Sequence, residues 1–254
     1  MINENLHRKP VALDRIKHRN TRLDTGARDL TDLRKMSAFF VAAAEFVDAC
    51  REFPLVWVRA GKDDAGKDLV APVAVFGMAT GENLCIEGDG WRVRYVPAML
   101  RLYPFAMARV SPSELVVCVD ESWVGLRAGG SDGQALFNPD GSATEFTQNI
   151  QRQLEQFETE VERTRAAGAL LVEHDLLRDM RFDATMPDGS KVSVDGFLTI
   201  DDAKLAALSD ADVVKLSRNG LLALIHAHQI SLGNMARLAE WHHQRLVAQA
   251  SSPS

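Results

Sequence analysis

The sequence predicts an α+β protein with a mainly antiparallel sheet, flanking helices and a long amphipathic C-terminal helix. Two observations carry this prediction. Short segments rich in β-branched and aromatic residues follow one another between residues 54 and 121 with short links, which favours antiparallel neighbours. Two later segments, which start near residues 145 and 221, repeat their apolar residues at three- and four-residue steps, as amphipathic helices do.

Residues 1–35 are expected to form a basic N-terminal arm. They carry nine Lys/Arg and five Asp/Glu, a net charge of +4, which leaves −10 for the rest of a chain whose net charge is −6. A basic segment on an acidic body is expected to dock on that body. The remainder, residues 36–248, is expected to form a single domain, with an internal boundary or a surface loop in the Gly- and Ser-rich stretch 128–144.

The first half of this domain predicts one helix and a set of strands. In the segment 37–53, Ser37 is a candidate N-cap and the apolar residues recur at helical spacing, so an amphipathic helix is expected. The segments 54–60 and 71–78 predict two strands of a hairpin with a long polar loop. The remaining expected strands, all short, lie at 83–88, 106–110 and 114–121.

The second half predicts longer helices. Ser142 and Glu145 match a capping box, so a helix is expected to begin here and to stop at Gly168. A hairpin is expected around the turn Pro187-Asp188-Gly189. The long amphipathic C-terminal helix is expected at 221–246.

Composition argues against several classes of protein. A net charge of −6 disfavours wholesale nucleic-acid binding. No apolar run reaches the ~20 residues that a membrane span needs, and the first residues lack the hydrophobic core of a signal peptide. The cysteines are widely spaced among apolar residues, which predicts buried, reduced thiols at Cys50, Cys85 and Cys118. We therefore expect a cytoplasmic protein with no membrane span and no nucleic-acid partner.

One motif imitates a phosphate-binding loop. Gly61, Gly66 and Lys67 match most of its pattern, but Asp68 stands where a hydroxyl residue should bind magnesium. The following residues are strand-like, so no helix N-terminus is available to hold an anion. Nucleotide binding is not expected here, and no cofactor is expected.

The histidines invite a metal hypothesis that helix geometry disfavours. His226 and His228 are two residues apart, so on a helix they point roughly 200° apart and cannot share an ion. His228 lies on the apolar stripe and is expected to be a hydrogen-bonded core residue, while His226 is expected to face solvent or a cleft. No metal site and no catalytic residue are assigned.

The most distinctive stretch is residues 81–105, "GENLCIEGDGWRVRYVPAMLRLYPF". Pro97 and Pro104 bracket a helix of about six residues that must be held by packing. Arg101 leaves this helix on its own face, suited to a carboxylate or phosphate. A ligand site is therefore predicted at this cluster, and its candidate residues are Glu82, Asn83, Trp91, Tyr95, Arg101, Tyr103, Asp120 and His226.

A structural alternative exists for the same residues. Arg101 could pair internally with Glu82 or Asp120, while the aromatic side chains fill the core. Both alternatives predict a stiff segment, and only the ligand hypothesis predicts a concave surface beside it.

Several segments resemble the bacterial SapC-like family; they are residues 12–23, 52–58, 72–87, 90–105 and 135–144. Two positions depart from the expected pattern. Cys85 stands where the resemblance implies a large aromatic residue, and Leu102 where it implies a second Arg. The resemblance implies an association with bacterial surface layers and transport, and it supplies no catalytic residues.

Three functional hypotheses follow. The first is an accessory protein of an uptake or modification pathway that binds a small molecule or peptide, or a protein partner including a second copy of itself. The second is an enzyme that uses His226 or His228 with Arg101 and Asp120. The third is a structural protein associated with a surface layer. An enzyme should gather titratable residues in one cleft, whereas a binding protein should show an aromatic-walled pocket without them.

Overall fold

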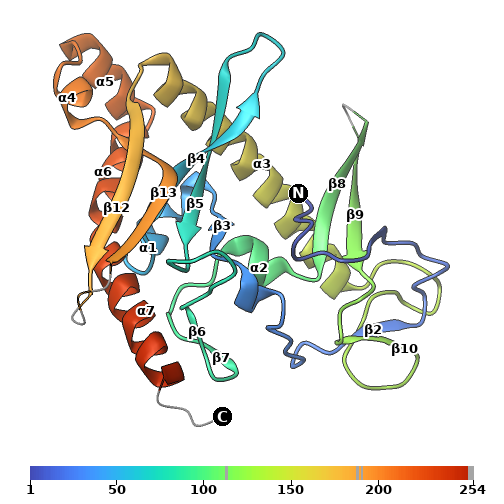
Figure 1. The fold of residues 1–254 in the computed structure, drawn as a ribbon. Coiled ribbons are helices and arrows are strands. Elements are labelled where there is room, and N and C mark those ends of the chain that lie inside the picture. The colour runs from blue at the N-terminus through green and yellow to red at the C-terminus, as the bar shows by residue number, and fades with distance from the viewer. Residues whose placement is uncertain (112–113, 187–188, 190, 251–254) are drawn as a thin grey trace. The chain divides into compact units, whose positions relative to one another are not determined.

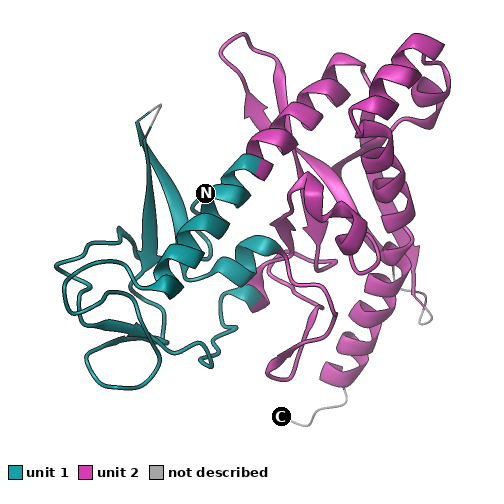
Figure 2. Cartoon of the chain, turned by 180° about the vertical axis from the view of Figure 1, so that it is seen from behind, with its two compact units in different colours: residues 1–33, 98–159 teal, residues 34–97, 160–254 magenta. Residues whose placement is uncertain are grey.

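The computed structural model describes residues 1–111, 114–186, 189 and 191–250 (Figure 1). The fold class is α+β with antiparallel sheets, as predicted. The chain forms two compact units, each made of two separate stretches (Figure 2): unit 1 contains 1–33 and 98–159, and unit 2 contains 34–97 and 160 onward. The domain boundaries drawn from the sequence stay a prediction. No helix within the described residues is long and apolar enough to cross a bilayer.

The first sheet of unit 1 has three antiparallel strands. Its order is β1 (Pro10–Ala12), β9 (Glu114–Asp120) and β8 (Phe105–Ser111). The strands β8 and β9 confirm the last two strands predicted from the sequence. The short helix α2 (Ala98–Leu102) precedes β8, as the flanking prolines predicted. Because β1 pairs along β9, the N-terminal residues form part of this sheet.

The second sheet of unit 1 surrounds β2 (Thr21–Leu23). This strand lies between β10 (Leu126–Ala128) and β11 (Gln134–Ala135), and both pairings are antiparallel. Between β10 and β11, Gly133 has a φ of 84°, and a Cβ there would lie 2.5 Å from the Leu23 carbonyl oxygen. Only glycine fits this conformation so close to the neighbouring backbone.

Unit 2 contains a five-stranded antiparallel sheet. Its order is β12 (Leu177–Thr185), β13 (Lys191–Ile200), β4 (Leu55–Lys62), β5 (Asp68–Val75) and β3 (Ala38–Phe40). The hairpins β4–β5 and β12–β13 confirm the two hairpins that the sequence predicted. Of the predicted turn between β12 and β13, Pro187 and Asp188 lie outside the described residues.

The helices of unit 2 follow the sheet in the chain. The short helices α4 (Asp202–Ala206) and α5 (Asp210–Arg218) lead to α6 (Leu221–Ser231) and α7 (Asn234–Ala250). The predicted C-terminal helix therefore forms, with an interruption at residues 232–233. Its second part supplies Met235, Leu238 and Ala239 to a core cluster with residues of the sheet.

The prediction of a helix at 37–53 is wrong for the first part of this segment. The chain forms β3 there, followed by a 3-10 turn (Ala43–Glu45) and a single helical turn, α1 (Phe46–Ala49). The strand β3 pairs with the edge of β5, where Phe39 is opposite Ala74. A short apolar run is compatible with either structure, and the available sheet edge decides the outcome.

The helix α3 (Glu145–Glu173) does not stop at Gly168 as predicted. A Cβ on Gly168 would lie 2.9 Å from the Val70 carbonyl oxygen and 3.0 Å from its Cγ2. Strand β5 therefore passes too close for any side chain, and glycine is present for packing rather than for helix termination.

The cap of α3 also differs from the prediction. The hydroxyl of Thr144 accepts a hydrogen bond from the Thr147 amide at 3.3 Å, which is the geometry of an N-cap. The hydroxyl of Ser142, the predicted cap, donates to the Asp140 carboxylate at 2.6 Å. Ser142 is thus part of the preceding turn.

Candidate functional site

The residues predicted as one site fall into both units. Arg101, Tyr103 and Asp120 belong to unit 1, whereas the residues from Glu82 to Tyr95 and His226 belong to unit 2. Arg101 lies on α2 with an exposed side chain. Each group has its own surroundings within its unit.

Asp120 is fully buried at the end of β9 and holds the N-terminal segment in unit 1. Its Oδ1 accepts from the Lys9 amide and from the Ser122 amide and hydroxyl, at 3.0, 3.0 and 2.7 Å. Its Oδ2 accepts from the Arg8 amide at 3.0 Å and the Tyr103 hydroxyl at 2.9 Å. Burial acts to raise the pKa of Asp120, but these hydrogen bonds outweigh it, and the pKa is lowered.

Tyr103 packs among rings of the same unit. Its ring meets Trp123 edge-on at a centroid distance of 5.0 Å and His7 at 5.3 Å. Burial, and the hydrogen bond to Asp120, raise the pKa of Tyr103. Tyr103 and Asp120 therefore contact each other and further residues of unit 1.

Glu82 and Asn83 occupy the turn before β6 (Ile86–Glu87) in unit 2. Glu82 accepts from the Met78 amide at 3.0 Å and lies 2.9 Å from Nδ1 of His242, on α7. The two side chains are only 12% and 11% exposed. Asn83 is buried, and its Oδ1 accepts from the Cys85 amide at 2.9 Å. The partnership of Glu82 with His242 joins residues 160 positions apart, so helical spacing gave no signal for it.

Trp91 and Tyr95 also pack inside unit 2. The indole Nε1 of Trp91 donates to the Tyr95 carbonyl at 2.8 Å, and its ring meets Phe76 edge-on at 5.3 Å. The Tyr95 hydroxyl donates to Glu45 at 2.8 Å. These contacts satisfy the polar tips of both rings.

The two histidines of α6 have different environments. His226 is exposed, with Nδ1 3.0 Å from Oε1 of Gln229. His228 is fully buried, with Nε2 2.9 Å from the Thr199 hydroxyl, and burial lowers its pKa to about 4. Among the described residues, no group of three His, Cys, Asp or Glu side chains is arranged to hold a metal ion.

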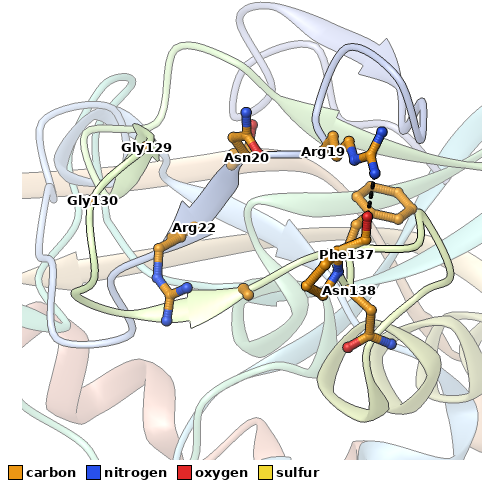
Figure 3. Close-up of a pocket in the computed structure, with 10 residues that line it drawn as sticks. Arg19, Asn20, Arg22, Gly129, Gly130, Phe137 and Asn138 are labelled. Atoms are coloured by element: carbon orange, nitrogen blue, oxygen red, sulfur yellow. Dashed lines mark hydrogen bonds between the residues drawn. The ribbon is translucent and has the colours of Figure 1, made fainter.

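The structure contains a hollow that the sequence did not predict (Figure 3). It has a volume of about 430 Å³ and lies in unit 1 beside β2. Three separate segments line it, with residues Arg19, Asn20, Thr21, Arg22, Gly129, Gly130, Ala135, Phe137, Asn138 and Pro139. No local sequence pattern predicts a cavity built from three such segments. The two arginines were the only sequence signal of a binding site here.

Backbone carbonyls hold both arginines of the hollow. Nη2 of Arg19 donates to the Pro139 carbonyl (dashed line in Figure 3). Nε of Arg22 donates to the carbonyls of Asp132 and Gly133 at 3.1 and 3.2 Å, and its Nη2 donates to Gly133 at 2.7 Å. A carbonyl orients a guanidinium without neutralising its charge.

Comparison with protein families assigns this chain. A family model described as SapC matches residues 13–238. The chain belongs to the SapC family. No curated protein and no solved structure matches it. The matched residues of this SapC-family chain include every residue that lines the hollow. The hollow is also lined from two segments that carried the sequence resemblance, residues 12–23 and 135–144.

Proposed function

We propose that this SapC-family chain is a cytoplasmic accessory protein that binds a ligand in the hollow of unit 1, within an uptake or modification pathway. The hollow itself carries the proposal. Its volume of about 430 Å³ is within the range of roughly 300–1,000 Å³ of small-molecule sites. Such a space suits a small molecule or a few residues of a peptide or partner protein.

The chemistry of the walls favours binding over catalysis. The ten described lining residues include two arginines, two asparagines and one aromatic ring, and none is Asp, Glu, His or Cys. General acid–base and nucleophilic catalysis ordinarily need such side chains at the reacting atoms. The walls instead offer hydrogen-bond donors and a ring surface, which suit recognition.

Asp120 and His228, which the enzyme hypothesis uses, do not line the hollow. Asp120 is occupied by donors of its own unit, and the neutral imidazole of His228 is buried against Thr199. Ligand binding by the residues of the 81–105 stretch stays a prediction, and Arg101 is one of its exposed cations.

A paired substitution tests whether the hollow is the site. Asn20 lines the hollow, is exposed and carries no hydrogen bond on its side chain among the described residues, so Asn20→Trp should obstruct the space without unfolding unit 1. Thr25→Trp places the same ring on an exposed position that does not line it. We expect a fragment and metabolite library, screened by thermal shift and by NMR line broadening, to yield binders of the parent and of Thr25→Trp that Asn20→Trp does not bind. Binders that Asn20→Trp retains at full affinity would place the site elsewhere.

A further inference from the structure

We infer that the hollow takes a ligand with two separated oxyanion groups, one for Arg19 and one for Arg22, joined by a short apolar linker. This inference rests on the proposed function, because it names the class of ligand that would occupy the same hollow. Three observations support it: neither guanidinium group has an ion-pair partner among the described residues, the two groups lie apart across the hollow, and part of the wall is apolar.

The first observation is the charge. Neither Arg19 nor Arg22 has an ion-pair partner among the described residues, since their hydrogen bonds go to backbone carbonyls. Other exposed arginines of the chain do pair with carboxylates, for example Arg59 with Asp179 at 2.7 Å, Arg127 with Asp24 at 2.8 Å and Arg163 with Glu160 at 2.6 Å. In a chain of net charge −6, two cations at one hollow that form no ion pair among the described residues concentrate positive potential there.

The second observation is the placement of the two groups. Figure 3 shows Arg19 beside Phe137 and Asn138, and Arg22 toward the end of the hollow that Gly129 and Gly130 form. The two guanidinium groups do not converge on one point, so a single carboxylate cannot contact both. A molecule with an oxyanion at each end can form a charge-assisted contact with each.

Arg22 is also fixed in position. Arg22 lies on the central strand of its sheet, paired with Arg127 of β10 and Ala135 of β11. Its Nε and Nη2 are held by the carbonyls of Asp132 and Gly133. Preorganised donors lose little entropy on binding, which favours affinity.

Two carboxylates near the hollow, Asp132 and Asp140, form no ion pair with its arginines among the described residues. Asp140 accepts from the Ser142 hydroxyl and amide at 2.6 and 2.8 Å, and these bonds, with the charge of Arg19, hold its pKa below the ordinary value. The Asp132 carboxylate lies 3.3 Å from the Ser131 hydroxyl. Asp140 therefore weakens the potential at Arg19 without forming an ion pair with it.

The third observation is the apolar part of the wall. Phe137 is half-buried and lines the hollow together with Ala135 and Pro139. An apolar chain contacts such a wall favourably, whereas a strongly hydrated linker does not. The ligand class is therefore a short aliphatic or aromatic molecule that carries an oxyanion at each end.

A length series tests this class. Straight-chain dicarboxylates from succinate to pimelate are titrated calorimetrically into the full chain at low salt, together with the monomethyl ester of each. A second arm uses alkanediol bisphosphates of the same lengths, which separates carboxylate from phosphate preference. We expect one length to bind best and its monoester to bind about tenfold to hundredfold more weakly, because it loses one charge-assisted contact.

Variants assign the two contacts. Arg19→Gln and Arg22→Gln should each weaken the best diacid by about tenfold to hundredfold, and each should weaken its monoester less, because the monoester can turn its single carboxylate toward the remaining arginine. Arg28→Gln is the matched control, because Arg28 is exposed and does not line the hollow, and within the described part of the chain it donates only to the carbonyls of Thr25 and Ala27. Circular dichroism melts check that each variant folds.

The outcomes separate this inference from the proposed function. If monoesters bind as tightly as diacids, or if either Gln variant binds like Arg28→Gln, the two-oxyanion inference is wrong while the hollow remains a binding site. If neither these probes nor any library member distinguishes Asn20→Trp from Thr25→Trp, the proposed function itself is wrong.

Discussion

Replacement of Asp120 by Asn is expected to destabilise the protein strongly, because five donors converge on the Asp120 carboxylate. The new amide NH₂ must take the place of one oxygen. At Oδ2 it would face the Arg8 amide, and at Oδ1 it would face the Lys9 and Ser122 amides. Either orientation sets a donor against a donor in a fully buried position.

The magnitude follows from the less damaging orientation. One buried N–H left without an acceptor costs about 1–3 kcal/mol, and the other bonds change from a charged to a neutral acceptor, which weakens them by about 1 kcal/mol in total. We therefore expect a loss of about 3 kcal/mol in the free energy of unfolding. For a chain of this size that corresponds to a decrease in Tm of about 6–12 °C.

Denaturant unfolding followed by fluorescence and circular dichroism measures this loss. Hydrogen exchange at the amides of Arg8 and Lys9 measures it locally, and both amides should lose protection. Glu114→Gln is the control, since Glu114 begins the same strand with an exposed side chain and should change stability by less than about 0.5 kcal/mol. A loss below about 1 kcal/mol for Asp120→Asn would refute the view that this carboxylate holds the N-terminal segment.

Further predictions concern four other positions. Ion pairs with Lys17 and Lys9 lower the pKa of Glu121 to about 2. The contribution of Glu121 to stability is therefore complete above its unfolded pKa, near 4.5, and is lost as the pH falls toward 2. Glu121→Gln should flatten the acid limb of a Tm-versus-pH curve, and an unchanged limb would contradict this. Gly168→Ala should lower the free energy of unfolding in urea by about 1–3 kcal/mol, because the new Cβ would contact the β5 backbone. A stabilised variant would show instead that β5 moves aside to accommodate the Cβ. Burial raises the pKa of the Cys85 thiol to about 12, so a thiol reagent at pH 8 should modify it only on unfolding, and rapid labelling of the folded protein would contradict its burial. Arg101→Ala should weaken any ligand that binds through the 81–105 stretch, and equal thermal shifts in parent and variant would remove Arg101 from that site.

The N-terminal segment shows how charge and pairing act together. The sequence predicted a basic arm that docks on an acidic body. Within unit 1, Lys9 and Lys17 do pair with Glu121, Arg8 pairs with Asp32, and His18 lies 3.3 Å from Glu121. The same segment supplies β2 and the two arginines of the hollow. Its docking is therefore a precondition for the proposed site.

Local sequence determined most of the secondary structure. The hairpins β4–β5 and β8–β9, the bracketed helix α2 and the long helix α3 follow from residue alternation, helical periodicity and proline geometry, which act between near neighbours. The same local information identified Cys85 and His228 as buried residues, because each lies within an apolar run.

Tertiary structure decided what local information could not. Residues 38–40 became a strand because the edge of β5 was available, and Gly168 is required because β5 crosses α3 there. The sequence predicted Asp120 as a ligand-binding residue, and only the structure shows that the amides of Arg8 and Lys9 donate to its carboxylate. The hollow depends on three segments more than 100 residues apart at their extremes, so its walls come together only when the sheet around β2 has formed. Contacts between distant residues are set by the packing of whole elements, and no short stretch of sequence contains them.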